Sequence, residues 1–199
     1  MAVRTLRDGT RVVLRPIEPH DKEALLEGFA RLSDESRYRR FFTPMPRLTQ
    51  AQLRYLTEVD HDRHEAVIAF EEETGEPIGV ARYVRLDHDA SVAEPAVTVV
   101  DHWQGRGLGT LLLDDISERA HAAGVERFAA TVLAANDPMI SLFEHLDTDA
   151  HETIRDGVLS IQADLPAAGT APSFRDALRA AATDRLALLK GMLDLGRGR

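Results

Sequence analysis

The spacing of hydrophobic residues in the first third of the chain predicts one strand followed by helices. Apolar and polar residues alternate across residues 10–19, which is the period of a half-buried strand. In residues 20–33 and 49–60, apolar residues recur three or four positions apart, which is the spacing of an amphipathic helix. A short helix is expected between these two, at residues 34–42.

The period changes to that of strands in the middle of the chain. Residues 65–73 and 78–86 flank the turn sequence Thr-Gly-Glu-Pro and are expected to form a hairpin. Residues 90–100 continue the series as a further strand and contain Pro95. Because proline has no amide hydrogen, this strand is expected at a sheet edge or at a bulge.

The remaining pattern completes one sheet and adds a helical tail. The expected elements are a helix at 111–124, a strand at 127–136, a helix at 138–146, a hairpin at 151–165, a linker at 166–172 and an amphipathic helix at 173–199. The fold class is therefore α/β (α+β), with one domain at residues 1–165 and an appendage at residues 166–199.

Composition narrows the class of protein and its partners. The net charge is −9, from 33 acidic against 24 basic residues, which favours cationic partners and argues against nucleic acid. No apolar run approaches the roughly 20 residues of a membrane span, and the N-terminus lacks the pattern of a secretory signal. There is no cysteine, so disulfides and thiolate metal sites are excluded. We expect a cytoplasmic protein that contacts neither nucleic acid nor membrane and needs no metal.

The stretch Gln-Gly-Arg-Gly-Leu-Gly at residues 104–109 carries the clearest chemistry. It joins an expected strand to an expected helix, and it is neither a P-loop, since no Lys follows Gly109, nor a G-x-G-x-x-G dinucleotide motif. Backbone amides at the start of a helix, together with the helix dipole, form an anion site. The diphosphate of a nucleotide or of coenzyme A fits this site.

This stretch also matches the Q/R-x-x-G-x-G/A signature of the GNAT acetyltransferases, in the element order of that family. Residues 31–42, 93–113 and 132–146 further resemble the bacterial Pat-type protein lysine acetyltransferases. The resemblance implies a GNAT fold, a mixed and mostly antiparallel sheet flanked by helices, with acetyl-CoA as acyl donor and a primary amine as acceptor. The residues implied to bind acetyl-CoA are Val99, Val100, Gln104, Gly105, Arg106, Gly107, Leu108, Gly109, Thr110 and Asn136.

The same resemblance implies the catalytic groups. A Glu lies ten residues before the signature Gln in the Pat-type family, and Glu94 stands at that distance from Gln104. Glu94 is the expected general base, because a lysine with a pKa of about 10.4 must lose a proton before it attacks. A backbone amide near Val99 and Val100 is expected to stabilise the oxyanion. Many family members place a Tyr acid where this chain has Phe143.

Several alternatives stay open at this level. The acceptor is a protein lysine or, as the second choice, a small amine such as an antibiotic; a non-catalytic CoA-binding sensor is a third interpretation. Asn136 either binds pantetheine or caps the next helix. Arg37, Arg39 and Arg40 either contact the CoA 3′-phosphate or an acidic substrate, or lie on a solvated helix face. A metal site in the 60–65 loop is disfavoured, and the protein is expected to be a monomer or a homodimer.

Overall fold

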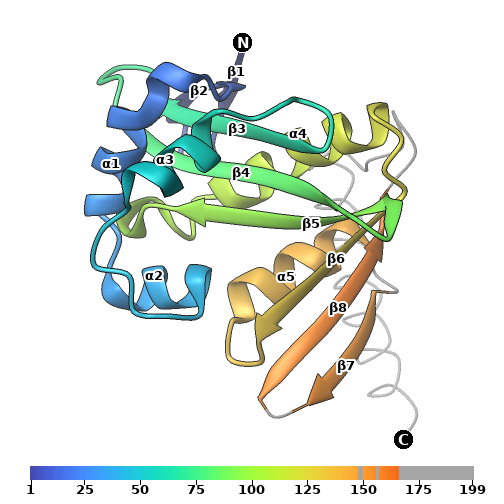
Figure 1. Ribbon diagram of the computed structural model, residues 1–199. Coiled ribbons are helices and arrows are strands. Elements are labelled where there is room, and N and C mark those ends of the chain that lie inside the picture. The colour runs from blue at the N-terminus through green and yellow to red at the C-terminus, as the bar shows by residue number, and fades with distance from the viewer. Residues whose placement is uncertain (148–149, 156, 166–199) are drawn as a thin grey trace, which may run out of the picture. The chain divides into compact units, whose positions relative to one another are not determined.

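The computed structural model describes residues 1–147, 150–155 and 157–165, which form one mixed sheet with helices on both faces (Figure 1). The strands are β1 (Ala2–Thr5), β2 (Arg11–Pro16), β3 (His64–Glu71), β4 (Pro77–Leu86), β5 (Asp89–Val99), β6 (Arg127–Leu133), β7 (His151–Arg155) and β8 (Val158–Asp164). The helices are η1 (Pro19–Asp21), α1 (Lys22–Ala30), α2 (Asp34–Phe41), α3 (Gln50–Thr57), η2 (Asp101–Trp103), α4 (Leu108–Ala122) and α5 (Asp137–Leu146).

The strand order across the sheet is β1-β2-β3-β4-β5-β6-β8-β7. Every neighbouring pair is antiparallel except β5 and β6, which are parallel. The predicted fold class, a mixed and mostly antiparallel GNAT-type sheet flanked by helices, is confirmed. The expected linker and C-terminal helix lie outside the described residues, so the division at residue 165 stays a prediction.

The helices divide between the two faces of the sheet and create two cores. α4 packs on β3, β4 and β5 from one side and contacts α5, while α1 and α3 contact each other, and α1 covers β4 from the other side. Each face has its own cluster of buried apolar residues. β3 lies between both layers, and its residues His64 to Ala69 are all buried. This double burial explains its nearly continuous apolar sequence.

The sheet opens between β5 and β6, and this opening determines where a ligand can enter. The parallel pairing covers only Val92 with Arg127 and Ala93 with Phe128. Figure 1 shows the two strands separating toward their C-terminal ends, with α2 beside the open end. Pro95 lies two residues beyond the last pair. The prediction from Pro95 is therefore modified: β5 is an interior strand, but from Pro95 onward its side toward β6 is unpaired.

Candidate active site

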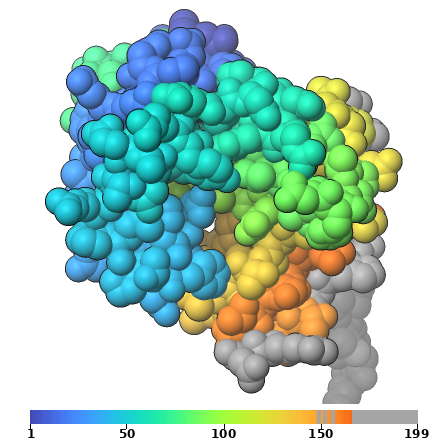
Figure 2. Space-filling model, in the orientation of Figure 1, coloured from blue at the N-terminus to red at the C-terminus, as the bar shows by residue number. Residues whose placement is uncertain are grey.

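The opening between β5 and β6 forms a cleft of about 470 Å³. Its walls come from the second half of β5, the signature loop, the start of α4, β6, the first turns of α5 and the end of α2. Figure 2 shows the molecular surface hollowed where the cyan helices, the green strands and the yellow-orange segment meet. Most of the residues that the resemblance implied for the site, Glu94 and Asn136 among them, therefore line one space, whereas Val100, Arg106 and Leu108 do not.

The signature loop requires glycine at two positions for its backbone path. Gly105 has a φ of 72° and Gly107 a φ of 90°, both in the left-handed region that L side chains rarely adopt. Gly107 occupies the N-cap position of α4, and the first amide to donate within that helix is that of Leu111, to the Gly107 carbonyl at 3.1 Å. The preceding amides of the first turn have no intrahelical acceptor. With the helix dipole they provide an anion site at the end of the cleft.

Two signature residues direct their side chains away from this cleft. The Arg106 guanidinium stacks over the Trp103 ring at 4.1 Å and donates to Asp8, with Nε and Oδ2 2.5 Å apart, and to Thr10 Oγ1 at 3.1 Å. Leu108 is 1% exposed and belongs to the core. Their predicted role in binding the donor is therefore limited to their backbone amides. Arg106 instead attaches the loop to the β1–β2 turn.

The Gln104 side chain closes the end of β5 rather than pointing freely into the cleft. Its Nε2 atom donates to the Val99 carbonyl at 3.0 Å and to Ser36 Oγ at 3.3 Å. Gln104 also lines the cleft. The signature Gln therefore joins the signature loop, β5 and α2 at one point.

Asp101 strengthens the same junction. Its carboxylate accepts from the Ser33 amide at 2.6 Å, Ser33 Oγ at 3.0 Å and Ser36 Oγ at 2.6 Å. Burial opposes ionisation of Asp101, but the hydrogen bonds from the two serines outweigh it and hold the pKa of this carboxyl below its ordinary value. The N-terminus of α2 is thus fixed to the segment that precedes the signature loop.

The backbone of β5 corrects one predicted contact. The Val100 amide donates to the Ile78 carbonyl at 3.0 Å, and the Val100 side chain is 3% exposed. Its amide therefore cannot also bind pantetheine or an oxyanion. Because the amides of an antiparallel strand alternate in direction, those of Val97 and Val99 face the unpaired side toward β6. Both residues line the cleft, so their amides, unlike that of Val100, are directed where a ligand could meet them.

Asn136 lies in the cleft wall and does not cap the following helix. It stands at the N-cap position of α5, but its side chain makes no capping hydrogen bond and has no hydrogen-bond partner among the described residues. The capping alternative is therefore wrong. The Asn136 side-chain amide is free to bind a ligand in the cleft.

Glu94 stands in the cleft wall. Its backbone pairs in register with Val84 of β4. The side chain is exposed and makes no hydrogen bond or ion pair with any described residue, although its charge acts on Arg40. Its side chain shares a face of β5 with Ala96 and Thr98, because alternate residues of a strand point the same way. A free carboxylate in the same cleft as the signature loop meets the geometric requirement for a base.

The three arginines of α2 near the cleft make different contacts. Arg37 packs over the Phe29 ring at 4.7 Å, and Arg39 forms an ion pair with Glu35 of the same helix at 2.5 Å. Arg40 lines the cleft and interacts electrostatically with Glu94. The solvated-face alternative therefore does not describe Arg40.

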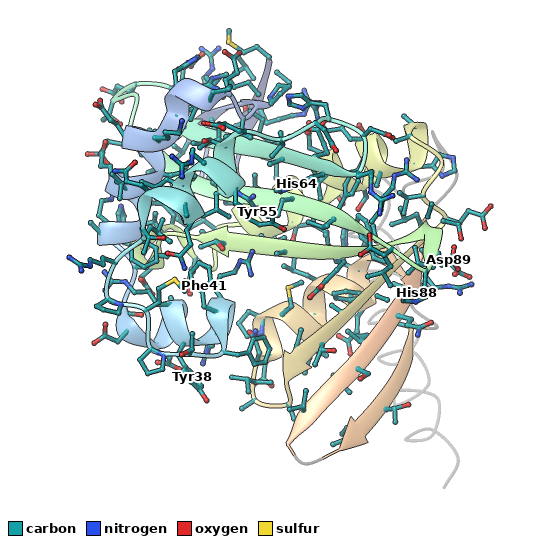
Figure 3. All side chains as sticks on the ribbon, in the orientation of Figure 1. Tyr38, Phe41, Tyr55, His64, His88 and Asp89 are labelled. Atoms are coloured by element: carbon teal, nitrogen blue, oxygen red, sulfur yellow. The ribbon has the colours of Figure 1, made fainter. Side chains whose placement is uncertain are left out.

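Two further cations near the cleft escaped the sequence prediction: Arg7 lines the cleft, and Arg82 lines a smaller cavity beside it. Arg7 lies beside Gly107, where a Cβ atom added to that glycine would be 3.3 Å from the Arg7 Nε. Arg82 of β4 is 6% exposed and donates to His64 Nε2 at 3.0 Å. Figure 3 shows His64 next to Tyr55, with ring centroids 5.0 Å apart. No motif marks Arg7 or Arg82, because only the tertiary fold brings them here.

Two other expectations concern a general acid at Phe143 and a metal site in the loop at residues 60–65. Phe143 is fully buried in the core and offers no proton to a leaving group. His61, from the loop considered as a metal site, contacts Glu65 with its Nδ1 atom 3.0 Å from Oε1. Within the described ranges, no three His, Cys, Asp or Glu side chains are grouped to hold a metal ion. Among those same residues, no helix has the length and hydrophobicity needed to cross a membrane.

The fold and the site together define a GNAT acetyltransferase. The model of the acetyltransferase (GNAT) family matches residues 26–147, and the chain belongs to this family. It is therefore assigned as an enzyme, an N-acetyltransferase of the GNAT type, as the resemblance predicted.

Particular relatives refine this assignment. The chain is 37% identical over 182 residues to acetyltransferase Pat of Mycolicibacterium smegmatis, which covers 87% of this chain and 54% of the relative. The chain thus spans about half the length of that relative. The crystal structure of the GNAT domain of S. lividans PAT is 36% identical, with a TM-score of 0.75, and the match covers 82% of this chain and 96% of that one.

A more distant structure includes the acyl donor. The fold is similar to that of yncA, a putative acetyltransferase from Salmonella typhimurium solved with its cofactor acetyl-CoA. The TM-score is 0.61 and the identity 18%, with 81% of this chain and 98% of that chain covered. At this identity the likeness concerns the fold. Acetyl-CoA, the expected donor, is the donor bound in that structure.

Proposed function

We propose that the protein transfers the acetyl group of acetyl-CoA to a primary amine, with a protein lysine as the first choice of acceptor. The observation that carries this proposal is the position of Glu94, whose unpaired carboxylate lines the same cleft as the signature loop. Lysine is the first choice because residues 31–42, 93–113 and 132–146 resemble the Pat-type protein lysine acetyltransferases. A cytoplasmic location, and a monomeric or homodimeric state, remain predictions.

Binding of the donor follows from the two ends of the cleft. The amides at residues 105–110 would bind the CoA diphosphate, and Arg7 beside Gly107 would add positive charge there. The pantetheine arm would pair with the unpaired backbone of Val97 and Val99, as an added strand does, and with the Asn136 side chain. This arrangement places the thioester toward Pro95, where β5 and β6 begin to separate.

The reaction would proceed by direct attack. The amine attacks the thioester carbonyl carbon, a C–N bond forms, the C–S bond breaks and the CoA thiolate leaves. Glu94 takes the proton that the amine must lose, directly or through one water. An amide of β5 facing the opening would stabilise the oxyanion. No dedicated acid is required, because a thiol with a pKa of about 8.5 is a tolerable leaving group.

The alternatives make different predictions in one assay. Thiol release from acetyl-CoA is measured with lysine peptides and with small amines, including amine antibiotics. We expect turnover on lysine peptides with a kcat/KM about tenfold or more above that of any small amine. Preferential turnover of small amines would support the second choice of acceptor. Tight acetyl-CoA binding without turnover on any acceptor would support the non-catalytic sensor.

A further inference from the structure

The wall beside Glu94 contains a buried arginine, Arg82, that no carboxylate of residues 1–147, 150–155 and 157–165 pairs with. Arg82 donates to His64 Nε2 at 3.0 Å and to the Leu56 carbonyl at 3.2 Å. Since a guanidinium only donates, His64 Nε2 must accept, and its ring is neutral. Burial and the charge of Arg82 lower the pKa of His64 to about 4. Among the described residues, Arg82 forms no ion pair.

Arg40 adds a second cation to the same place. Its guanidinium lies over the Phe41 ring at 5.1 Å and forms no hydrogen bond or ion pair within the described part of the chain. Burial and the charge of Arg40 lower the pKa of Arg82 to about 9, so the two guanidinium groups repel each other. Within the described part of the chain, Glu94 is the carboxylate whose charge stabilises that of Arg40. The group therefore carries one uncompensated positive charge.

These two arginines line a small second cavity that lies beside the main cleft. This cavity has a volume of about 70 Å³, and apart from the arginines its lining is mostly apolar, with Leu56, Ile68 and Val80 among its residues. Arg40, Ala96 and Thr98 line both spaces. Ala96 and Thr98 share the Glu94 face of β5. The second cavity thus borders the segment of β5 where the thioester is proposed to lie.

The size and chemistry of this cavity select a short chain with a charged end. A volume of about 70 Å³ holds on the order of five water-sized groups. A succinyl group exceeds an acetyl group by one methylene and one carboxylate, which fits this space. An unpaired buried charge is costly, and a carboxylate with good hydrogen-bond geometry would offset that cost.

We propose that Arg40 and Arg82 form a carboxylate-binding site for the end of the acyl chain, so that the protein accepts a short dicarboxylic acyl-CoA, such as succinyl-CoA, in addition to acetyl-CoA. This inference rests on the proposed function, because it places the thioester beside Ala96. The chemistry is unchanged: the amine forms a C–N bond with the thioester carbonyl, the CoA thiolate leaves, and Glu94 takes the proton. The carboxylate stays intact and is bound by the arginines.

The decisive comparison is between succinyl-CoA and butyryl-CoA, whose acyl chains have the same number of carbons and differ in a terminal carboxylate or methyl group. Their dissociation constants are measured by calorimetry on the wild-type protein without an acceptor. We expect succinyl-CoA to bind about tenfold or more tightly, as for a hydrogen-bonded buried charge. Equal or tighter binding of butyryl-CoA would overturn the proposal.

Variants test which residues bind the carboxylate. In each variant the dissociation constants of succinyl-CoA and butyryl-CoA are compared as a ratio, because partial loss of folding weakens the binding of both ligands alike. Arg82→Met and Arg40→Gln are expected to bring the ratio close to one. Arg39→Gln, which removes a neighbouring charge that is paired with Glu35, is expected to keep the wild-type ratio. If Arg82→Met does not fold, Arg40→Gln alone decides. A ratio that survives in Arg40→Gln would contradict the proposal.

The same experiments separate this inference from the proposed function. Acetyl-CoA is included in every binding series and in a transfer assay with lysine peptides. If the wild-type protein transfers acetyl groups but binds succinyl-CoA and butyryl-CoA equally tightly, the carboxylate site is refuted and the acetyltransferase function stands. A failure to bind acetyl-CoA would refute both.

Discussion

A single methyl group at Gly107 tests whether the signature loop is the diphosphate site. Gly107 has a φ of 90°, and an added Cβ would lie 3.3 Å from Arg7 Nε and 3.4 Å from Arg7 Cγ. Alanine in the left-handed region costs about 1–2 kcal/mol. For a domain of this size each kcal/mol lowers Tm by about 2–4 °C, so Gly107→Ala is expected to melt about 2–8 °C below the wild type.

The loop would also relieve this strain by shifting its amides, and the amides are what would bind the diphosphate. We therefore expect the Kd for acetyl-CoA to rise tenfold or more, which corresponds to about 1.4 kcal/mol of lost binding. The assay is calorimetric titration with acetyl-CoA, combined with thermal unfolding of the same samples.

Gly124→Ala is the matched control. Gly124 has a φ of 86° at the other end of α4, and no atom lies within 4 Å of the Cβ position. The same backbone strain arises there without touching the cleft, so stability should fall while the Kd stays that of the wild type. If Gly107→Ala loses stability but binds acetyl-CoA with wild-type affinity, then the assignment of the diphosphate to this loop is wrong.

Three further predictions follow from side chains of the site. Asn136→Ala should change the unfolding free energy by less than about 0.5 kcal/mol, because no capping hydrogen bond is lost. The KM for acetyl-CoA should rise in this variant. An unchanged KM would show that Asn136 does not bind the donor. In the folded state the pKa of His64 is lowered to about 4, whereas in the unfolded chain it is about 6.5. As pH falls from about 6.5 to 4, the unfolded chain therefore binds a proton at His64 that the folded chain does not bind. The folded state loses on the order of 3 kcal/mol of stability over this range. Denaturation across that pH range should show a smaller loss in His64→Gln, and equal slopes would contradict the assigned pKa. Asp101→Asn removes the charge that accepts from Ser33 and Ser36, which loosens α2 from the signature loop; we expect a lower Tm and weaker acetyl-CoA binding together, and a Tm loss alone would show that this junction does not support the donor site.

Elements with a strong hydrophobic period were predictable, and those without one were not. The strands in the middle of the chain and α4 follow their predicted segments closely, because burial imposes the period of 2 or 3.6 directly on the sequence. β1 was missed, since its four residues are mostly exposed and carry no buried alternation. It exists because β2 offers an unpaired edge, which is a property of the assembled sheet rather than of residues 2–5.

The site divides in the same way between local and tertiary causes. The glycines of the signature loop were predictable, because a left-handed backbone requires glycine wherever it occurs. The predicted contact of the Val100 amide with the donor was wrong, because that amide donates to the Ile78 carbonyl of the neighbouring strand. The sequence of β5 alone does not show in which direction this amide points. Arg40 and Arg82 come from different elements that meet only in the folded chain. Their sequence neighbours therefore carry no sign of the cavity that they line.

The central claim, that Glu94 is the base of an acetyltransferase cleft, is tested most directly by the kcat/KM of Glu94→Gln for acetyl transfer to a lysine peptide at pH 7. A lost general base is expected to lower kcat/KM by about 10²–10⁴-fold. The deficit should shrink toward pH 10, where the lysine amine deprotonates without help. Glu118→Gln, at an exposed carboxylate of α4, controls for the change in net charge. Wild-type kcat/KM in Glu94→Gln with unchanged acetyl-CoA binding would contradict the account.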